Sequence, residues 1–563
     1  MLLEAPRFWT WAHIEMNDEN FEEIFQSERF QNVSKFSLLG VDGEKLTTFY
    51  SELLNYKPFN GFLDISQRDL SGVSTELLTK LFTIINWVFM KKITLTDEQI
   101  SQIFLSIEQS EKLKLNCLYS ISTSLSSVSP SSLARAAVRL RKLELYEAGL
   151  TSAQAAALFS LLVERAECGL EYLELGHNNL SEVPAEVLAS AVVRVQEVKL
   201  SHCSLTSAQS EAILLRIAEA GAVTRLSVLD LHGNNLATVP PATISAALLR
   251  LAQVEVHMTE LTSEQVVAIF QRIASQDSPE LRLKKLVIWS NDLSTVPSES
   301  LSKASVKLEE VSLFLTRLTR DQVNALLTRI VETDDLKLRS LDVCDNDLSS
   351  VPRSVLVEVV RKMQEINLYH TLLTQDQLEG VIQTIAQSEG DQLKLNKIDL
   401  RYNNFSSISS DTLSRSSVRL EKISLENSQL SQEQIIAILT RITDCIDGDL
   451  KLKHLEIGKN DLSKVPIDLL VQSVIKLEDV SLRESQLTSE QIDTIFKTIA
   501  ERKELQLKSL DVRLNDLSCL TSSVLQTVKS RVTWLYLTAD ISPECHRIIY
   551  RKSRPQTTEN SSR

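Results

Sequence analysis

Residues 226–236 read LSVLDLHGNNL, and this spacing of leucines ahead of an asparagine returns along most of the chain. The leucines alternate with polar residues over the first half of the stretch, which is typical of a short strand with one buried face. Six further stretches share the pattern, so the sequence predicts an array of one repeated structural unit. The asparagines, which we call slots, are Asn178, Asn234, Asn291, Asn346, Asn403, Asn460 and Asn515.

A second series of slots lies between the asparagines and carries mostly small residues. Each asparagine precedes the next member of this series by 25 residues and follows the previous one by 30 to 32. Continuing these steps predicts more degraded slots at Thr123, Ile93, Arg68, Val41 and Asp540, and therefore about 19 strands. The members of the second series are Ala148, Cys203, Thr259, Thr316, Thr371, Ser428 and Ser485.

Helix signals follow both kinds of slot. The asparagine slots lead into Leu-Ser-x-Val-Pro, as at residues 180–184, 293–297 and 462–466, where the proline suits the first turn of a helix. The second series leads into the capping box Thr/Ser-x-x-Gln ahead of an amphipathic run. We expect capping boxes at Thr206–Gln209, Thr262–Gln265, Thr374–Gln377, Ser431–Gln434 and Thr488–Gln491. Each repeat is thus expected to run strand, turn, helix, with the buried slot side chain satisfying backbone groups along the stack.

This alternation resembles the leucine-rich-repeat superfamily, and its two repeat types resemble the ribonuclease-inhibitor class. The resemblance implies an α/β solenoid, a horseshoe of about 19 repeats with a concave parallel sheet and convex helices. We expect residues 1–20 to be an N-terminal cap, residues 21–545 the solenoid, and residues 546–563 a flexible tail. A fold of this kind does not identify a partner.

Composition narrows the functional classes. The formal net charge of −14 argues against nucleic-acid binding, which needs dense positive charge. Seven cysteines without a C-x-x-C pair disfavour a disulfide framework. The N-terminus lacks a basic and then apolar leader, and no apolar run is long enough to cross a membrane. We therefore expect a cytoplasmic protein, with the nucleus as the alternative compartment, and neither nucleic acid nor membrane as a partner.

The N-terminal segment Pro6–Trp11, PRFWTW, resembles the end of an F-box domain where it enters the first repeat. In F-box/leucine-rich-repeat proteins, that domain docks on the adaptor of a cullin-type ubiquitin ligase and the repeats hold the substrate. The resemblance implies a substrate-recognition part of such a ligase, with the adaptor-binding helices upstream of Met1. The alternative is that Phe8, Trp9 and Trp11 cap the exposed end of the core.

The residue two places before each slot varies freely from repeat to repeat, so it is available for recognition. We call this set the recognition column. Large aromatics stand in its middle, where Trp289 and Phe314 are expected on neighbouring strands about 5 Å apart. We predict a protein partner on the concave face, because exposed aromatic patches commonly mark interfaces. The predicted partner-binding residues are His232, His257, Met258, Trp289, Phe314, Leu315, Tyr369 and Tyr402.

Two places further upstream, the asparagine repeats carry acids that we call the acidic stripe. Only Val287 interrupts it. The stripe suits a basic segment of a partner. The alternative is that the acids pair with lysines and arginines of neighbouring strands. Its members are Glu174, Asp230, Asp342, Asp399, Glu456 and Asp511.

No catalytic motif or phosphate-binding loop occurs, so we expect a non-catalytic scaffold without cofactor or metal. Cys344, in the recognition column, is expected to face solvent. Two alternatives to the interpretation as a ubiquitin-ligase subunit remain. One is a binding module like the ribonuclease inhibitor or an innate-immune receptor. The other is a metal-dependent enzyme that uses His177, His202, His232 and His257, which fall near the ends of consecutive strands.

Overall fold

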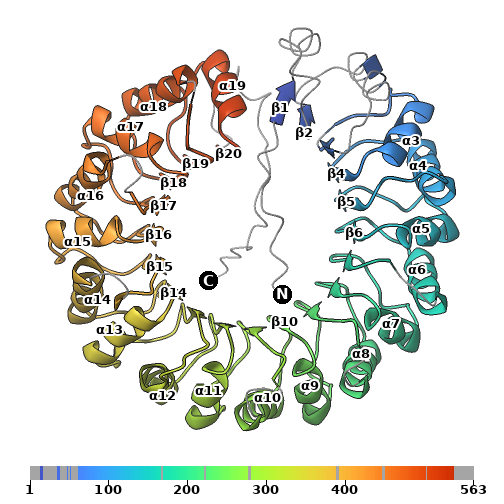
Figure 1. Ribbon diagram of the computed structural model, residues 1–563, viewed down its shortest axis with the longest axis horizontal. Coiled ribbons are helices and arrows are strands. Elements are labelled where there is room, and N and C mark those ends of the chain that lie inside the picture. The colour runs from blue at the N-terminus through green and yellow to red at the C-terminus, as the bar shows by residue number, and fades with distance from the viewer. Residues whose placement is uncertain are drawn as a thin grey trace. The chain divides into compact units, whose positions relative to one another are not determined.

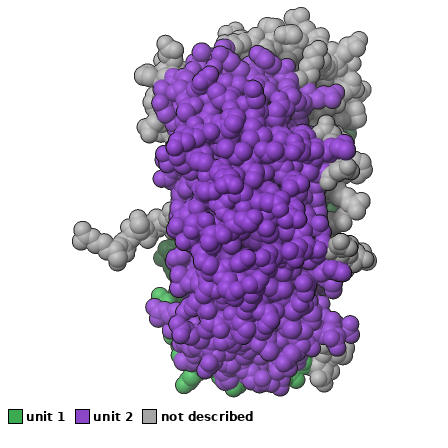
Figure 2. Space-filling model, turned by 90° about the vertical axis from the view of Figure 1, so that its left-hand side faces the viewer, with its two compact units in different colours: residues 1–291 green, residues 292–563 purple. Residues whose placement is uncertain are grey.

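The structure is a computed structural model that divides into two compact units, Met1–Asn291 and Asp292–Arg563. It describes residues 13–16, 35–38, 47–48, 51, 61–66, 68–165, 169–220, 224–276, 281–388, 392–446, 450–502 and 504–537. The F-box-like segment Pro6–Trp11 and the expected tail, residues 546–563, lie outside these residues. Figure 2 colours the two units and looks onto the helical side of the second.

Unit 1 alternates short strands with helices (Figure 1). Its strands are β1 His13–Met16, β2 Lys35–Leu38, β3 Phe62–Asp64, β4 Trp87–Lys91, β5 Cys117–Ile121, β6 Lys142–Glu144, β7 Tyr172–Glu174, β8 Glu197–Lys199, β9 Val228–Asp230, β10 Gln253–Glu255 and β11 Lys285–Val287. Its helices are α3 Thr75–Ile84, α4 Asp97–Gln109, α5 Pro130–Ala137, α6 Ser152–Glu164, α7 Ala185–Val192, α8 Ser207–Glu219, α9 Pro241–Leu248 and α10 Ser263–Ser275.

Unit 2 continues the same alternation. Its helices are α11 Ser298–Ser305, α12 Arg320–Glu332, α13 Arg353–Lys362, α14 Gln375–Gln387, α15 Ser410–Ser417, α16 Gln432–Asp444, α17 Ile467–Ile475, α18 Ser489–Glu501 and α19 Ser522–Arg531. Its strands are β12 Glu310–Ser312, β13 Ser340–Asp342, β14 Glu365–Asn367, β15 Lys397–Asp399, β16 Lys422–Ser424, β17 His454–Glu456, β18 Asp479–Ser481, β19 Ser509–Asp511 and β20 Trp534–Tyr536.

Within each unit, every strand pairs in parallel with the next along the chain. The helices cover one face of the sheet, on the outer side of each unit's curve, and the strands lie on the inner side (Figure 1). We call the uncovered face the strand face. Leucine, isoleucine and valine side chains between the two layers are almost wholly buried. The predicted fold, an α/β leucine-rich-repeat solenoid with a parallel sheet, is confirmed.

The two repeat types differ in helix length, which explains their unequal spacing. Helices after asparagine slots have 8 to 10 residues, as in α7, α13 and α17, whereas those after the second series have 13, as in α8. All five predicted capping boxes are present. Three more begin at Thr96, Thr151 and Thr319.

The capping-box glutamine also joins consecutive repeats, which the sequence pattern does not reveal. Gln377 accepts a hydrogen bond from the N–H of Thr374 at 2.7 Å. Its amide nitrogen donates to the carbonyl oxygens of Leu348 and Val351 in the preceding repeat, at 2.9 and 2.7 Å. Because Gln377 is buried, these contacts replace hydration that folding removes.

The asparagine slots bridge repeats as predicted. Asn234 donates to the carbonyl oxygen of Leu200 at 2.7 Å and accepts from the N–H groups of Cys203 and Leu205, both at 3.1 Å. In the second series, Thr259 donates instead to the carbonyl oxygen of Val256 at 2.6 Å. One asparagine therefore satisfies backbone groups of two repeats.

Two details differ from the sequence-based expectation. The proline of Leu-Ser-x-Val-Pro is the N-cap of its helix, one residue earlier than expected, as Pro184 shows for α7. The described residues also contain twenty strands, because β1 pairs with β2 ahead of the first predicted slot. Its sequence, HIEM, lacks the leucine pattern. Among the described residues, no helix combines the length and apolar composition needed to cross a membrane.

Candidate functional site

The strand face owes its exposed side chains to a left-handed turn after each strand. From Lys92 to Leu514, the residue immediately before each slot has a positive φ, for example 52° at Met258, 52° at Leu315 and 59° at Tyr402. A residue with a Cβ adopts this conformation at a cost in free energy. The cost is small for asparagine and absent for glycine, which has no Cβ. We call these residues the turn row: Lys92, Ser122, Glu147, His177, His202, Gly233, Met258, Ser290, Leu315, Asp345, His370, Tyr402, Asn427, Lys459, Glu484 and Leu514.

In unit 1, the recognition column and the turn row together form a continuous row of neighbouring rings, tilted or edge-on at one end and stacked at the other, which we call the ring ladder. His257 lies between His232 and Trp289, with ring centroids 4.2 and 4.0 Å away and interplanar angles of 14° and 20°. The next contacts, from His232 to His202 and onward, are 5.0, 4.7 and 4.8 Å. The ladder consists of Tyr146, His177, His202, His232, His257 and Trp289.

The ladder places the predicted unit 1 residues side by side but does not expose them equally. Met258 is 46% exposed, and His232 and Trp289 are half-buried. His257 differs from the expectation of an open patch, because the rings on both sides leave it only 6% exposed. Burial and the neighbouring His232 lower the pKa of His257 to about 3.

Phe314 and Leu315 belong to unit 2, whereas Trp289 belongs to unit 1. Phe314 is half-buried, and Leu315 is 49% exposed in its left-handed turn. The predicted proximity of Trp289 and Phe314 stays a prediction.

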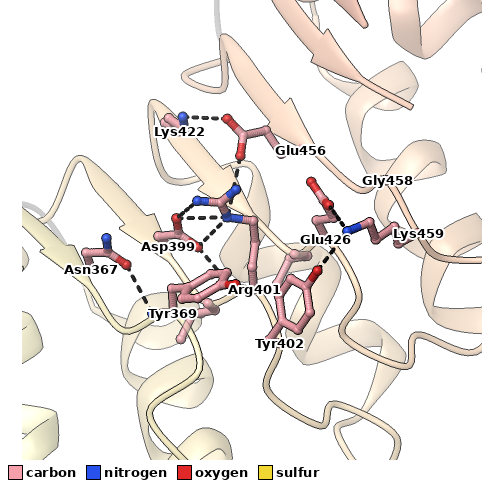
Figure 3. Close-up of polar contacts among 12 residues, drawn as sticks. Asn367, Tyr369, Asp399, Arg401, Tyr402, Lys422, Glu426, Glu456, Gly458 and Lys459 are labelled. Carbon is pink, nitrogen blue, oxygen red and sulfur yellow. Dashed lines mark hydrogen bonds and ion pairs between the residues drawn. The ribbon is translucent and has the colours of Figure 1, made fainter. Parts of the chain in front are cut away.

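Tyr369 and Tyr402 lie together in unit 2, with ring centroids 5.0 Å apart (Figure 3). The guanidinium of Arg401 lies 5.2 Å from the centre of the Tyr369 ring. Arg401 also donates to both carboxylate oxygens of Asp399 at 2.6 to 3.0 Å, and its Nε lies 3.8 Å from Glu456. The paired charges fix the orientation of the arginine beside the Tyr369 ring.

A second set of polar contacts holds the other tyrosine. Lys459 donates to the hydroxyl oxygen of Tyr402 at 2.7 Å, and its ammonium lies 3.3 Å from Glu426 (Figure 3). Both the hydrogen bond and the neighbouring carboxylate raise the pKa of Lys459 against the effect of its desolvation. The two tyrosines are therefore anchored from different repeats.

The carboxylates of the acidic stripe mainly accept hydrogen bonds within their own repeats. Asp230, Asp399 and Asp511 each accept a hydrogen bond from the N–H two residues later, at 2.9, 3.1 and 3.0 Å. Asp342 and Glu174 do the same, at 3.2 and 3.0 Å. This local hydrogen bond stabilises the backbone turn at the end of the strand.

The charges of the stripe are only partly paired across strands. Asp511 pairs with Arg513 of its own repeat at 2.6 Å. Glu456 pairs across strands with Lys422 at 2.6 Å, as the alternative interpretation expected. Burial would raise the pKa of Glu456, but Lys422 and Arg401 outweigh it and hold the pKa below its ordinary value. For Glu174, burial dominates and raises the pKa to about 8, with Lys199 offsetting only part of the effect.

The expectation that Cys344 faces solvent is wrong. Its side chain is 5% exposed, and burial raises the pKa of the thiol. The neighbouring repeats carry the longer side chains of Phe314 and Tyr369 at the same position, so they cover a short thiol between them. Ser201 of the recognition column is buried as well.

Other exposed residues beside the slots were missed because the sequence comparison tabulated only the column two places before the slot and took from the turn row only Met258, Leu315 and Tyr402. Leu372, one place after the slot, is 58% exposed, and Leu514 of the turn row is 49% exposed. Both have a positive φ, as Leu315 does. Comparing the places directly beside each slot would have found them. Arg401 and Lys459, which orient the tyrosines, carry no such signal.

No family model matches the sequence, and no curated protein matches it. Among solved structures, the chain is similar to the one titled "Crystal structure of Rad7 and Elc1 complex in yeast". The identity is 14% and the TM-score 0.42, and the alignment covers 69% of this chain and 88% of that chain. A similarity of this extent carries no argument about partner or activity.

Proposed function

We propose that this chain is a non-catalytic scaffold that binds a protein through its strand face. The observation that carries the proposal is the exposure of Met258, Leu315 and Leu372 in left-handed turns. A large apolar side chain gains little in such a place, since it is neither buried nor in a preferred conformation. Binding a partner would cover these side chains and account for their presence.

The anchored tyrosines support the same proposal. Tyrosine combines a large contact area with few rotatable bonds and is frequent at the energetic centres of interfaces. Arg401 and Lys459 hold Tyr369 and Tyr402 before any partner arrives, which reduces the entropy lost on binding. We propose these residues, with Leu315, as the partner-binding surface of unit 2.

We propose a partner segment that combines apolar residues with positive charge. The net charge of −14 would attract such a segment over a distance. Most acids of the stripe already accept backbone hydrogen bonds or pair with arginine. We therefore propose that they mainly attract the partner over a distance and contribute few direct contacts. The apolar side chains would then supply most of the affinity.

A finer proposal is that the scaffold is the substrate-recognition part of an F-box-type ubiquitin ligase subunit. It is supported by the resemblance of Pro6–Trp11 alone. A binding module like the ribonuclease inhibitor or an innate-immune receptor is the alternative. Affinity purification of the intact gene product, scored for a cullin adaptor, distinguishes them. Copurification of the adaptor supports the ligase, and its reproducible absence removes that proposal.

The scaffold proposal is tested with Leu315→Asn and Leu372→Asn in the full chain. Asparagine suits a positive φ, so the melting temperature should be unchanged or slightly higher. We expect captured proteins to fall at least tenfold in the double variant. Leu215→Gln is the matched control, because Leu215 is 43% exposed on helix α8, away from the strand face. Capture that survives the double variant, or that Leu215→Gln removes equally, would refute the proposed surface.

A further inference from the structure

Three side chains of unit 1 offer ligand atoms that all lie within 4.8 Å of one another: His232, Glu255 and His257. They come from two consecutive repeats. His232 follows strand β9, Glu255 ends the adjacent strand β10, and His257 stands two residues after Glu255. Two imidazoles and one carboxylate make up a donor set typical of zinc.

His257 has an unsatisfied polar atom at this place. Its side chain is 6% exposed, and its Nδ1 is buried without a hydrogen-bond partner. Leaving a buried polar atom without a partner is unfavourable. A cation bound to this Nδ1 would take the place of the missing partner.

His232 already has a carboxylate behind its ring. Its Nδ1 lies 2.7 Å from the Oδ1 of Asp230. Because a carboxylate only accepts, a neutral His232 donates from Nδ1, which leaves the lone pair on Nε2. Metal-binding histidines commonly have such a carboxylate behind them.

The charges around the cluster also favour a cation. Glu255 is the register partner of Asp230 on one side and of Val287 on the other. Directly opposed carboxylates repel each other. Lys199 is the register partner of Asp230 on the far strand, and it also lies 3.6 Å from Glu197. Glu255 itself accepts a hydrogen bond from the neutral amide of Gln253 at 2.9 Å. Neither strand beside Glu255 therefore places a cation at its register position, and Lys199, whose charged form Glu255 helps to stabilise, lies two strands away.

We propose that His232, Glu255 and His257 form a zinc site on the strand face of unit 1, with Asp230 positioning His232. Zinc bonds of about 2.0–2.2 Å place tetrahedral donors about 3.4 Å apart. The His232 and His257 rings are stacked with an interplanar angle of 14°, whereas two imidazoles that share a cation must each have it in the plane of the ring. One of the two rings therefore has to turn out of the stack when zinc binds, and the donors have to approach one another by about 1 Å. Three protein ligands leave a fourth position for water or a ligand from outside. The site differs from the sequence-based expectation of no metal, and it does not depend on the proposed protein partner.

Zinc titration of the chelator-treated full chain tests the proposal, by calorimetry and by competition with a chromophoric chelator. We expect one zinc ion per chain. His257→Phe, which retains a ring in the stack, and Glu255→Gln should each weaken binding at least tenfold. His370→Phe is the matched control, because the Nδ1 of His370 also lies beside a carboxylate, 2.6 Å from Asp345. It should leave binding unchanged.

Tryptophan fluorescence provides a second readout at the site itself. The Trp289 ring stacks on His257 at 4.0 Å, so a metal bound there should change the emission. The change should disappear in Trp289→Phe while zinc binding persists. The proposal is overturned if the wild type binds no zinc. It is also overturned if binding survives both His257→Phe and Glu255→Gln, or if His370→Phe weakens it equally. Glu255→Gln keeps the test valid if His257→Phe does not fold.

Discussion

The carboxylate of Glu174 accepts a hydrogen bond from the N–H of Gly176 at 3.0 Å while its side chain is 7% exposed. A Cβ at position 176 would lie 2.7 Å from the same carboxylate oxygen, so a side chain there would disturb this contact. Glu174 thus stabilises the turn that follows its own strand, and the hydrogen bond from Gly176 needs only an acceptor at position 174. Burial raises the pKa of Glu174 to about 8, which gives the folded protein a pH dependence.

We predict that Glu174→Gln stabilises the protein above neutral pH. The unfolded carboxyl loses its proton near pH 4.5, whereas the folded one keeps it until about pH 8. The folded state then binds more protons, so the free energy of unfolding falls as pH rises between these values and is level above them. The loss is at most about 5 kcal/mol.

Glutamine retains the acceptor and cannot ionise. Urea unfolding at pH 5 and pH 8.5 should therefore show a smaller difference in Glu174→Gln than in the wild type. Equal pH dependence in the two proteins would contradict the assignment.

We predict that Gln377→Ala destabilises the protein by about 3 kcal/mol. The change leaves one N–H and two carbonyl groups without their partner, and each buried loss costs about 1–3 kcal/mol. Gln387→Ala, at the last residue of helix α14, is the control because Gln387 is exposed and its replacement should cost less than about 0.5 kcal/mol. Similar melting temperatures for the two variants would show that the bridge between repeats contributes little.

Arg401→Lys should cost about 1–2 kcal/mol, because lysine cannot reproduce the forked contact with Asp399 or lie flat near Tyr369. Arg320→Lys provides the comparison. Arg320 is exposed and makes a single contact with Asp347 at 3.3 Å, so its replacement should be nearly neutral. Chemical denaturation of both variants measures the difference, and equal costs would mean that the fork is not stabilising.

Gly233→Ala should destabilise unit 1 more than Gly149→Ala. Both glycines have a positive φ, 68° and 61°, so both alanines bear the strain of a left-handed residue, about 1–2 kcal/mol. A Cβ at position 233 would also lie 2.3 Å from the His202 ring, whereas at position 149 its nearest neighbour is 3.7 Å away. Thermal unfolding of the pair separates strain from crowding in the ring ladder. A larger loss in Gly149→Ala would exclude crowding as the cause.

The sequence by itself determined the repeat and its core. Leucines at fixed spacing dictate which strand positions are buried. The slots and capping boxes can also be recognised from the sequence, because each contacts residues of its own repeat or of the adjacent repeat. The one unexpected strand, His13–Met16, has no leucine pattern to mark it.

Only the tertiary structure decided which strand-face residues are exposed and which contact one another. His257 and Cys344 stand in the same column as Tyr369, yet both are buried, His257 between the rings of His232 and Trp289. The proximity of His232, Glu255 and His257 also depends on the parallel register of β9 and β10. His232 is 23 positions from Glu255 and 25 from His257, yet the three become neighbours there. Exposure depends on the sizes of the side chains in both neighbouring repeats, which no single repeat contains.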